Sequence, residues 1–344
     1  MKKFKAIHVG CGGIADSWFT VTKNHPNIEW VGIVDLDVEV AKAKARQFGL
    51  PVGLATSDLE KCLRESGADL VFDCTVPSAH KHIVLSAVGK GCHVLGEKPL
   101  AESMADAREM VKAAQEAGVT YGVMQNRRWQ PNGIQRVRAA LDSGMIGQAH
   151  TFHSDFFIGA HFGGFRDEMK HVLLFDMAIH SFDQIRYLTD APPVKVWAQD
   201  WNPPGSWYAD GASAVAFFEH EDQIRSSYRG SWCAEGLSTS WQCQWRILGT
   251  KGSLMWDGED GIEVEQLCGT EGLVRDCVSI PVPEVDANAT PSGHEAGILN
   301  FLQSLCEGTQ PATPAYDNFH SLAMVHGAIA SAESGESVCL SSLG

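Results

Sequence analysis

The chain has 344 residues with a hydrophobic content of 44% and a charged content of 20%, which is typical of a globular protein with room for two domains. Asp and Glu number 42 against 27 Lys and Arg, so the net charge is −15. This acidic balance argues against nucleic acid and anionic lipid as partners. The ten cysteines form no Cys-x-x-Cys pair, and the sequence shows neither an export signal nor a membrane-spanning apolar run. We therefore expect a cytoplasmic protein with reduced thiols and no membrane contact.

The first third of the chain predicts alternating strands and helices. The expected strands are residues 4–9, 28–34, 69–75, 94–96 and 121–124, and segments with helical spacing separate them. Strands and helices that alternate at this spacing indicate βαβ units with a doubly wound parallel sheet. We therefore expect residues 1–124 to form an α/β domain of the Rossmann type.

A glycine turn lies between the first expected strand and the helix that follows it, with the pattern Gly10-x-Gly12-x-x-Ala15. Gly10 permits the tight turn, and Gly12 lets the backbone approach a pyrophosphate. The N-terminus of the helix offers free N–H groups to the anion. The turn residues expected to hold a dinucleotide are Gly10, Gly12, Gly13 and Ile14.

Asp35 ends the second expected strand, 20 residues after Ala15. A carboxylate at this place accepts hydrogen bonds from the adenine ribose of a dinucleotide. Asp37 adds a second negative charge, and no arginine follows directly to receive a 2′-phosphate, so we predict NAD in preference to NADP. The alternative is a set of turn glycines followed by an aspartate that caps a helix.

After residue 124 the alternation stops and strands follow one another. A helix is expected at 131–141, a strand at 148–157, a glycine-rich loop at 159–165 and a helix at 173–188. Further strands are expected at 194–201, 212–218, 223–232, 241–248 and 254–256, and helices at 295–306 and 317–331. This order indicates an α+β domain over residues 125–344, with a large, mostly antiparallel open sheet.

The tripeptide Glu97-Lys98-Pro99 follows one of the expected parallel strands. A lysine at the carboxyl end of such a strand points into the crevice where ligands bind. Asp176 and His180 are four residues apart, so a helix places them on one face, and the carboxylate can orient the imidazole. A lone histidine on a helix is more often a packed or surface residue. Asp176, His180 and His171 also have the chemistry of metal ligands, but no His-x-x-x-His pair is present, and we expect no metal.

Eight of the ten tryptophans lie at or beyond Trp129. They are either platforms on which a sugar stacks or large aromatics that fill the faces of a sheet and an oligomer contact. The second interpretation is favoured for most of them. Trp232, at the end of an expected strand, is the one candidate for a substrate pocket.

Taken together, these motifs resemble the glucose-fructose oxidoreductase / inositol dehydrogenase / MocA family. The residues that carry the resemblance are the glycine turn, Thr75-Val76-Pro77-Ser78-Ala79-His80, the segment from Gly91 to Leu100, and Asp176-x-x-x-His180-x-x-Asp183. The resemblance implies an NAD(P)-dependent oxidoreductase that acts on sugars, polyols or related compounds. It also implies a homodimer or homotetramer assembled through the open sheet of the second domain.

Carried over residue by residue, the resemblance implies a catalytic set of Lys98, Asp176 and His180. His180 is expected to take the hydroxyl proton with Asp176 as its orienting partner, while Lys98 hydrogen-bonds the reacting oxygen. Glu97 matches a position beside the nicotinamide ribose, and the Lys98–Pro99 bond is expected to be cis.

Other positions match the family less directly. Thr75, Pro77 and His80 match the segment that lines the cofactor crevice, and Asp155 matches a contact to a substrate hydroxyl. Arg127 and Arg128 either edge the crevice or are hinge or surface arginines. Two further functions stay open: a relative that cleaves glycosides with a retained NAD, and a non-catalytic NAD-binding sensor.

Overall fold

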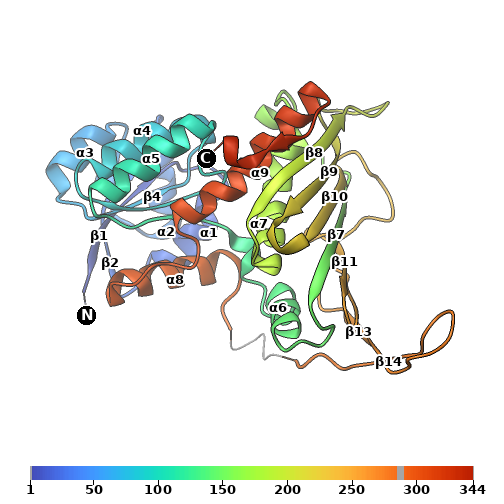
Figure 1. Ribbon diagram of the computed structural model, residues 1–344. Coiled ribbons are helices and arrows are strands. Elements are labelled where there is room, and N and C mark those ends of the chain that lie inside the picture. The colour runs from blue at the N-terminus through green and yellow to red at the C-terminus, as the bar shows by residue number, and fades with distance from the viewer. Residues whose placement is uncertain (1, 285–289, 344) are drawn as a thin grey trace. The chain divides into compact units, whose positions relative to one another are not determined.

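The computed structural model describes residues 2–284 and 290–343, and the chain divides into two compact units (Figure 1). Unit 1 comprises Met1–Asn126 and Ser292–Phe319, and unit 2 comprises Arg127–Pro291 and His320–Gly344. The division between residues 124 and 125 into two functional domains stays a prediction. Among the residues described, no helix combines the length and the apolar content that a membrane span requires.

Unit 1 is built on a six-stranded parallel sheet with the strand order β3-β2-β1-β4-β5-β6. The strands are β1 (Phe4–Val9), β2 (Ile28–Val34), β3 (Ala55–Thr56), β4 (Leu70–Asp73), β5 (His93–Gly96) and β6 (Tyr121–Val123). The helices are α1 (Ala15–Thr22), α2 (Val38–Phe48), α3 (Leu59–Ser66), α4 (Pro77–Val88), α5 (Met104–Glu116) and α8 (Gly293–Glu307). This strand order is that of a doubly wound dinucleotide-binding sheet, which confirms the predicted fold of the first domain.

Local signals set the ends of these helices. Asp37 caps α2 by accepting a hydrogen bond from the backbone N–H of Glu39, and Gly49 ends the helix with a φ of 69°. Ser103 caps α5 in the same way through the N–H of Asp106. Side chains at these positions satisfy N–H groups that a helix leaves unpaired, and a glycine adopts the left-handed conformation without strain.

The core of unit 1 is completed by a helix from late in the chain. Apolar residues of α8 are buried in one cluster with residues of the parallel sheet and α1, and their side chains include Ile298, Phe301, Leu302 and Leu305. Trp18 of α1 and Phe72 of β4 belong to the same cluster. The cluster therefore joins segments that are nearly 300 residues apart in sequence, as the position of α8 beside α1 in Figure 1 also shows.

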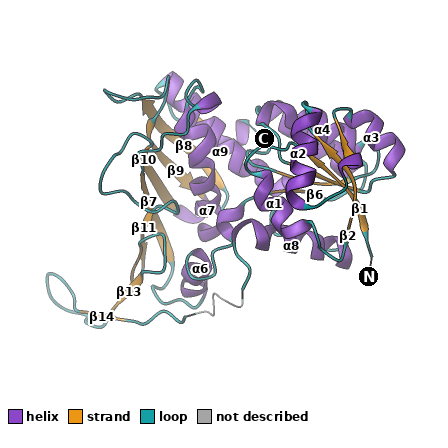
Figure 2. Ribbon diagram, turned by 180° about the vertical axis from the view of Figure 1, so that it is seen from behind, coloured by secondary structure: helices purple, strands orange, loops and turns teal. Residues whose placement is uncertain are grey.

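Unit 2 is built on a nine-stranded sheet with the order β14-β13-β12-β11-β7-β10-β9-β8-β15 (Figure 2). The strands are β7 (Ala149–Phe157), β8 (Pro193–Trp201), β9 (Ser213–His220), β10 (Arg225–Ser231), β11 (Gln244–Gly249), β12 (Gly252–Trp256), β13 (Ile262–Leu267), β14 (Cys277–Ser279) and β15 (Val338–Cys339). The helices are α6 (Ile134–Asp142), α7 (Ile179–Thr189) and α9 (Ala315–Ser334), which belongs to unit 2 from His320 onward. Within the described part of the chain, the strands of this sheet pair antiparallel except β7 with β10, which confirms the predicted α+β fold.

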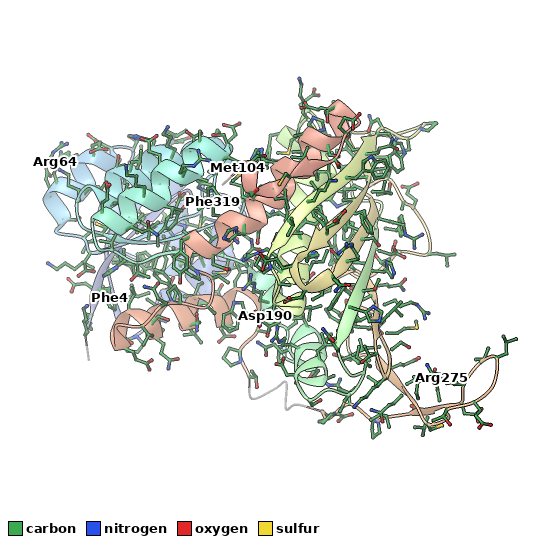
Figure 3. All side chains as sticks on the ribbon, in the orientation of Figure 1. Phe4, Arg64, Met104, Asp190, Arg275 and Phe319 are labelled. Atoms are coloured by element: carbon green, nitrogen blue, oxygen red, sulfur yellow. The ribbon has the colours of Figure 1, made fainter. Side chains whose placement is uncertain are left out.

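The two faces of this sheet differ in character, and side chains project from both (Figure 3). On one face, Phe182 of α7 packs edge-on against Phe218 and Tyr228, with ring centroids 4.8 and 5.5 Å apart. On the other face, Trp197 is 39% exposed and its neighbour in register, Phe217, is 42% exposed. Side chains along the strands thus point alternately to a face that α7 covers and to an open face that carries large apolar groups.

The helix expected over residues 173–188 differs from the structure at its beginning. Leu173–Ala178 is a π-helical segment, and α7 follows it directly at Ile179. Asp176 therefore lies in a π-helical turn and His180 in α7, so the single α-helix expected for this pair is not present, while their shared orientation stays a prediction. The prediction also missed α3, β3, β13, β14 and β15.

Candidate functional site

The glycine turn of unit 1 has the form of an anion cradle. Gly10 has a φ of 90°, and a Cβ on it would lie 2.7 Å from the carbonyl oxygen of Cys74, so only glycine fits there. A Cβ on Gly12 or Gly13 would meet nothing within 4 Å. Among the residues described, the backbone N–H groups of Gly12, Gly13 and Ile14 have no protein acceptor. Free amides at the start of α1, with open space around them, fit the pyrophosphate of a dinucleotide.

Asp35 is held in a fixed orientation at the end of β2. Its Oδ2 accepts a hydrogen bond from the backbone N–H of Cys11 at 2.8 Å, and its Oδ1 accepts one from the N–H of Asp37 at 3.0 Å. Each carboxylate oxygen accepts more than one hydrogen bond, so the ribose interaction predicted for Asp35 remains open to it. The side chain of Asp37 is used in capping α2.

Behind the turn, a buried acid–histidine pair joins β4 to α4. Asp73 Oδ2 lies 2.8 Å from His80 Nδ1, and Thr75 Oγ1 donates to Asp73 Oδ1 at 2.6 Å. Burial lowers the pKa of His80, but the adjacent Asp73 carboxylate outweighs burial and raises this pKa above its usual value. His80 Nε2 is buried without a hydrogen-bond partner among the residues described. A buried donor of this kind, next to the glycine turn, also fits a bound ligand.

Pro77, the third residue predicted in this segment, occupies the first turn of α4, where its missing N–H costs nothing. Thr75 and His80 therefore act first as partners of Asp73, and Pro77 as the start of a helix.

The Glu97-Lys98-Pro99 segment follows β5, and its peptide bond between Lys98 and Pro99 is cis, as predicted. The Glu97 side chain is buried, and its Oε1 accepts a hydrogen bond from Trp18 Nε1 at 2.8 Å. His294 Nε2 of α8 lies 3.3 Å from the same oxygen. Sequence reasoning missed Trp18 and His294, because nothing local marks either of them as a partner of Glu97.

In unit 2, Asp176 and His180 are both buried, with exposed fractions of 8% and 7%. Arg166 donates from Nε to Asp176 Oδ2 at 2.6 Å. The guanidinium of Arg166 also lies over the rings of Phe162 and Phe165, at 5.0 and 4.7 Å from their centroids. Arg166, which directly follows the glycine-rich loop, is therefore the ionic partner of Asp176, a role that the sequence did not predict for it.

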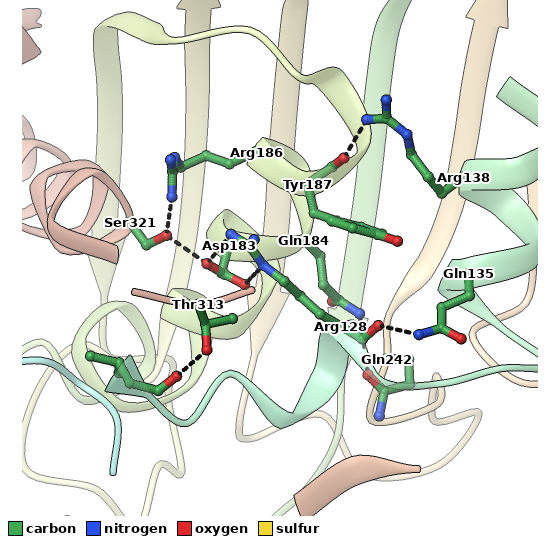
Figure 4. A network of polar contacts seen from close by, with 11 residues as sticks. Arg128, Gln135, Arg138, Asp183, Gln184, Arg186, Tyr187, Gln242, Thr313 and Ser321 are labelled. Atoms are coloured by element: carbon green, nitrogen blue, oxygen red, sulfur yellow. Dashed lines mark hydrogen bonds and ion pairs between the residues drawn. The ribbon is translucent and has the colours of Figure 1, made fainter. Parts of the chain in front are cut away.

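Asp183, the last member of the Asp-x-x-x-His-x-x-Asp pattern, forms a buried network (Figure 4). Arg128 binds it with two hydrogen bonds, from Nε to Oδ2 at 2.6 Å and from Nη2 to Oδ1 at 2.7 Å. Ser321 Oγ donates to the same Oδ1 at 2.8 Å. Arg128 and Ser321 each stand within two residues of a point where the chain enters unit 2. Asp183 thus ties both of these segments to α7, the helix that carries His180.

Arg127 is buried in unit 2, where its Nη2 lies 3.5 Å from the sulfur of Met177. Burial lowers the pKa of Arg127 to about 10. The structure therefore places this predicted cofactor contact against the π-helical segment, and Arg128 in the Asp183 network.

The two predicted substrate contacts, Asp155 and Trp232, have different surroundings in the structure. Arg229 holds the carboxylate of Asp155 with two hydrogen bonds on the open face, opposite the face that α7 covers. Trp232 is only 1% exposed and packs against Tyr208 and Phe162, with ring centroids 5.7 and 5.2 Å away. Its indole N–H is buried without a partner among the residues described.

His171, considered above as a metal ligand, is paired with Asp200 at 2.6 Å between Nδ1 and Oδ2. Over residues 2–284 and 290–343, no three His, Cys, Asp or Glu side chains gather in a group that could hold a metal ion.

Both parts of the chain match known protein families. Residues 4–125 match the model of an oxidoreductase family described as an NAD-binding Rossmann fold, and residues 134–255 match the GFO/IDH/MocA C-terminal domain. A D-apiose dehydrogenase from Paraburkholderia graminis is 28% identical over 354 residues, covering 100% of this chain and 91% of the relative. A 1,5-anhydro-D-fructose reductase from Ensifer adhaerens is 25% identical, covering 95% and 96%.

Among solved structures, an oxidoreductase from Agrobacterium radiobacter, in complex with NAD+, L-tartaric acid and magnesium, superposes with a TM-score of 0.88. Its sequence is 22% identical, and each chain is covered over its full length, so this similarity concerns the fold. The two family models and the full-length relatives show that the chain belongs to the GFO/IDH/MocA family of NAD-binding oxidoreductases.

Proposed function

We propose that the protein is a dehydrogenase or reductase that transfers a hydride between NAD and a CH–OH or keto carbon of a sugar, polyol or related compound. The observation that carries the proposal is the pairing, in unit 1, of a free-amide cradle at Gly12–Gly13 with a lysine set beside a fixed, buried Glu97. The names of the full-length relatives, a D-apiose dehydrogenase and a 1,5-anhydro-D-fructose reductase, support carbohydrate as the substrate class.

The residues divide the work of the reaction. A bound nicotinamide supplies the hydride acceptor or donor. Lys98 donates a hydrogen bond to the reacting oxygen and stabilises the negative charge that develops when the hydroxyl proton leaves. His180 takes that proton, and Asp176, which Arg166 holds at 2.6 Å, supports the charged imidazole. Asp155 is not included among the proposed substrate-binding residues, because its carboxylate is hydrogen-bonded to Arg229 on the open face of the sheet.

The cofactor preference proposed is NAD over NADP. Two backbone amides fix the Asp35 carboxylate, so it cannot turn away from a 2′-phosphate. A fixed negative charge repels a phosphate dianion and binds a diol.

Two further features support proposals about the whole protein. All ten cysteines lie within the described residues and are free thiols, which supports work in the reducing cytoplasm. The exposed Trp197 and Phe217 on the open face of the nine-stranded sheet support self-association through that face.

The test is a panel of aldoses, ketoses and polyols with NAD, read by the absorbance of reduced nicotinamide. We expect at least one compound to give NADH in proportion to substrate consumed, which excludes glycoside cleavage with a retained cofactor. Lys98→Ala should lower kcat by about a hundredfold and leave the Kd of NAD nearly unchanged, because the lysine contacts the reacting oxygen.

The exposed Lys90 provides the matched control, since Lys90→Ala removes the same side chain away from the site. Tight NAD binding without turnover on any compound would instead identify a sensor. Equal losses of turnover and NAD affinity in Lys98→Ala would contradict the role given to the lysine.

A further inference from the structure

We propose that His294 and Trp18 are positioning residues for Lys98, and that they act by holding the Glu97 carboxylate in place. The inference rests on the proposed function, because it concerns the lysine that contacts the reacting oxygen. It adds to the site a residue from α8, nearly 200 positions beyond the lysine that it serves.

The geometry is a two-donor clamp on one carboxylate oxygen. Trp18 Nε1 donates to Glu97 Oε1 at 2.8 Å, and His294 Nε2 lies 3.3 Å from the same oxygen. The other oxygen, Oε2, accepts the backbone N–H of Lys98 at 3.3 Å. Oε1 of Glu97 is therefore held by residues of α1 and α8. Oε2 is hydrogen-bonded to the backbone of Lys98, the residue whose side chain it positions.

The clamp is rigid because its parts are buried. The side chains of Glu97 and His294 are only 10% and 19% exposed, and Trp18 is fully buried. Trp18 packs in the same apolar cluster as Ile298 and Phe301 of α8, so the two donors come from elements that pack against each other. A side chain fixed by packing and by hydrogen bonds keeps a neighbouring functional group in place more precisely than a loop does.

The charges around Glu97 favour its ionised form. Burial, the largest contribution, raises its pKa, but hydrogen bonds from His294 and Trp18 and the charge of Lys98 outweigh burial and bring the pKa below its usual value. His80 and Cys74, from α4 and the end of β4, are the other titratable groups that interact with it. A buried carboxylate stays charged only where such donors offset the loss of water.

The packing of α8 in unit 1 brings His294 to Glu97. His294 is the second residue of α8. Farther along the helix, the side chains of Ile298, Phe301 and Leu302 are buried. The packing of α8 therefore fixes the position of the His294 imidazole beside the Glu97 carboxylate.

The experiment compares four variants on a substrate found active with the wild-type protein. His294→Ala removes one donor, Trp18→Phe removes the other, and His294→Gln keeps an amide donor at the same reach. His82→Ala, at an exposed site on α4, is the matched control. We expect His294→Ala and Trp18→Phe each to lower kcat by about tenfold, since a hydrogen bond to a charged group is lost, with the Kd of NAD within about threefold of wild type. His294→Gln should recover most of the activity, and His82→Ala should match wild type.

A double-mutant cycle separates a role through Lys98 from a general loss of structure. In the Lys98→Ala background, His294→Ala should lower the remaining turnover by less than about twofold, because the group that it positions is already gone. A full tenfold loss in that background, or no loss in the single variant, would overturn the inference while leaving the proposed function intact. Absence of turnover in the wild-type protein would instead contradict the proposed function, so the two failures are distinct.

Discussion

Asp35 illustrates how a single residue can be prepared for recognition before any ligand arrives. Its two oxygens are held by the N–H groups of Cys11 and Asp37, at 2.8 and 3.0 Å. The carboxylate therefore loses little conformational entropy when it binds a diol, and it cannot move aside for a phosphate.

This arrangement predicts the effect of Asp35→Ala on cofactor choice. We expect kcat/KM with NAD to fall and that with NADP to rise, so that their ratio decreases by about tenfold or more, because a diol acceptor is lost and a repulsion is removed. Steady-state kinetics with both cofactors measures the ratio. Asp37→Ser is the control, since serine keeps the cap of α2 and removes a neighbouring charge. An unchanged ratio in Asp35→Ala would show that the ribose is recognised elsewhere.

Single residues that belong to short motifs could be predicted from the sequence, but their partners from distant parts of the chain could not. The glycine turn, Asp35 and Glu97-Lys98-Pro99 stand at recognisable spacings, because each is read within one strand–helix connection. His294 and Arg166 carry no such signal, since each acquires its role only when folding brings it to Glu97 or Asp176.

At the scale of elements, the Asp183 network joins α7 to the two segments by which the chain enters unit 2 (Figure 4). The Arg128 and Asp183 side chains are only 12% and 2% exposed. Removing one partner of such a pair leaves a buried charge without compensation, which is far more costly than the net value of the pair.

We therefore expect Asp183→Ala to lower the free energy of unfolding of unit 2 by about 3 kcal/mol or more. Ser321→Ala, which leaves the ion pair intact, should cost about 1 kcal/mol. Asp142→Ala breaks an exposed ion pair with Arg138 and should cost less than about 0.5 kcal/mol.

Urea unfolding followed by tryptophan fluorescence measures all three, because eight of the ten tryptophans lie in residues 127–291. A loss below about 1 kcal/mol in Asp183→Ala would show that Arg128 finds another partner or reaches solvent.

Elements with strong periodicity were predictable from the sequence, and those without it were not. The parallel strands other than β3, and the helix α2, agree with prediction to within a few residues, since apolar runs, caps and glycines mark their ends. The π-helical segment was not distinguishable, because Leu173, Leu174, Asp176, Met177 and Ala178 are all buried and no exposed face reveals the period. β13 was missed because Val264 is its one fully buried position.

At the scale of the whole molecule, the open face of the nine-stranded sheet predicts self-association. Trp197 and Phe217 lie side by side in register, and Trp201 and Met255 on the same face are 47% and 43% exposed. Large apolar groups gathered on one face of a sheet are characteristic of an interface between subunits.

We expect the wild-type protein to have a solution mass of at least twice 37.3 kDa. The double variant Trp197→Asp, Phe217→Asp should shift toward the monomer, because two buried carboxylates would oppose the interface. Light scattering after size exclusion gives the mass. Leu273→Asp, at a fully exposed position outside that face, is the control. A double variant that keeps the wild-type mass would locate the interface elsewhere.

The return of α8 to unit 1 has a consequence for how the protein is made. Ribosomes deliver the chain from its N-terminus, so all six parallel strands emerge long before Ile298, Phe301 and Leu302, which complete their core. During that interval unit 1 exposes the apolar surface that α8 later covers, while the intervening residues 127–291 are still being synthesised. Synthesis of unit 1 thus begins before that of unit 2, but unit 1 is completed only after most of unit 2 has been made. Nascent chains stopped before residue 292 should therefore depend on chaperones more than the complete protein does.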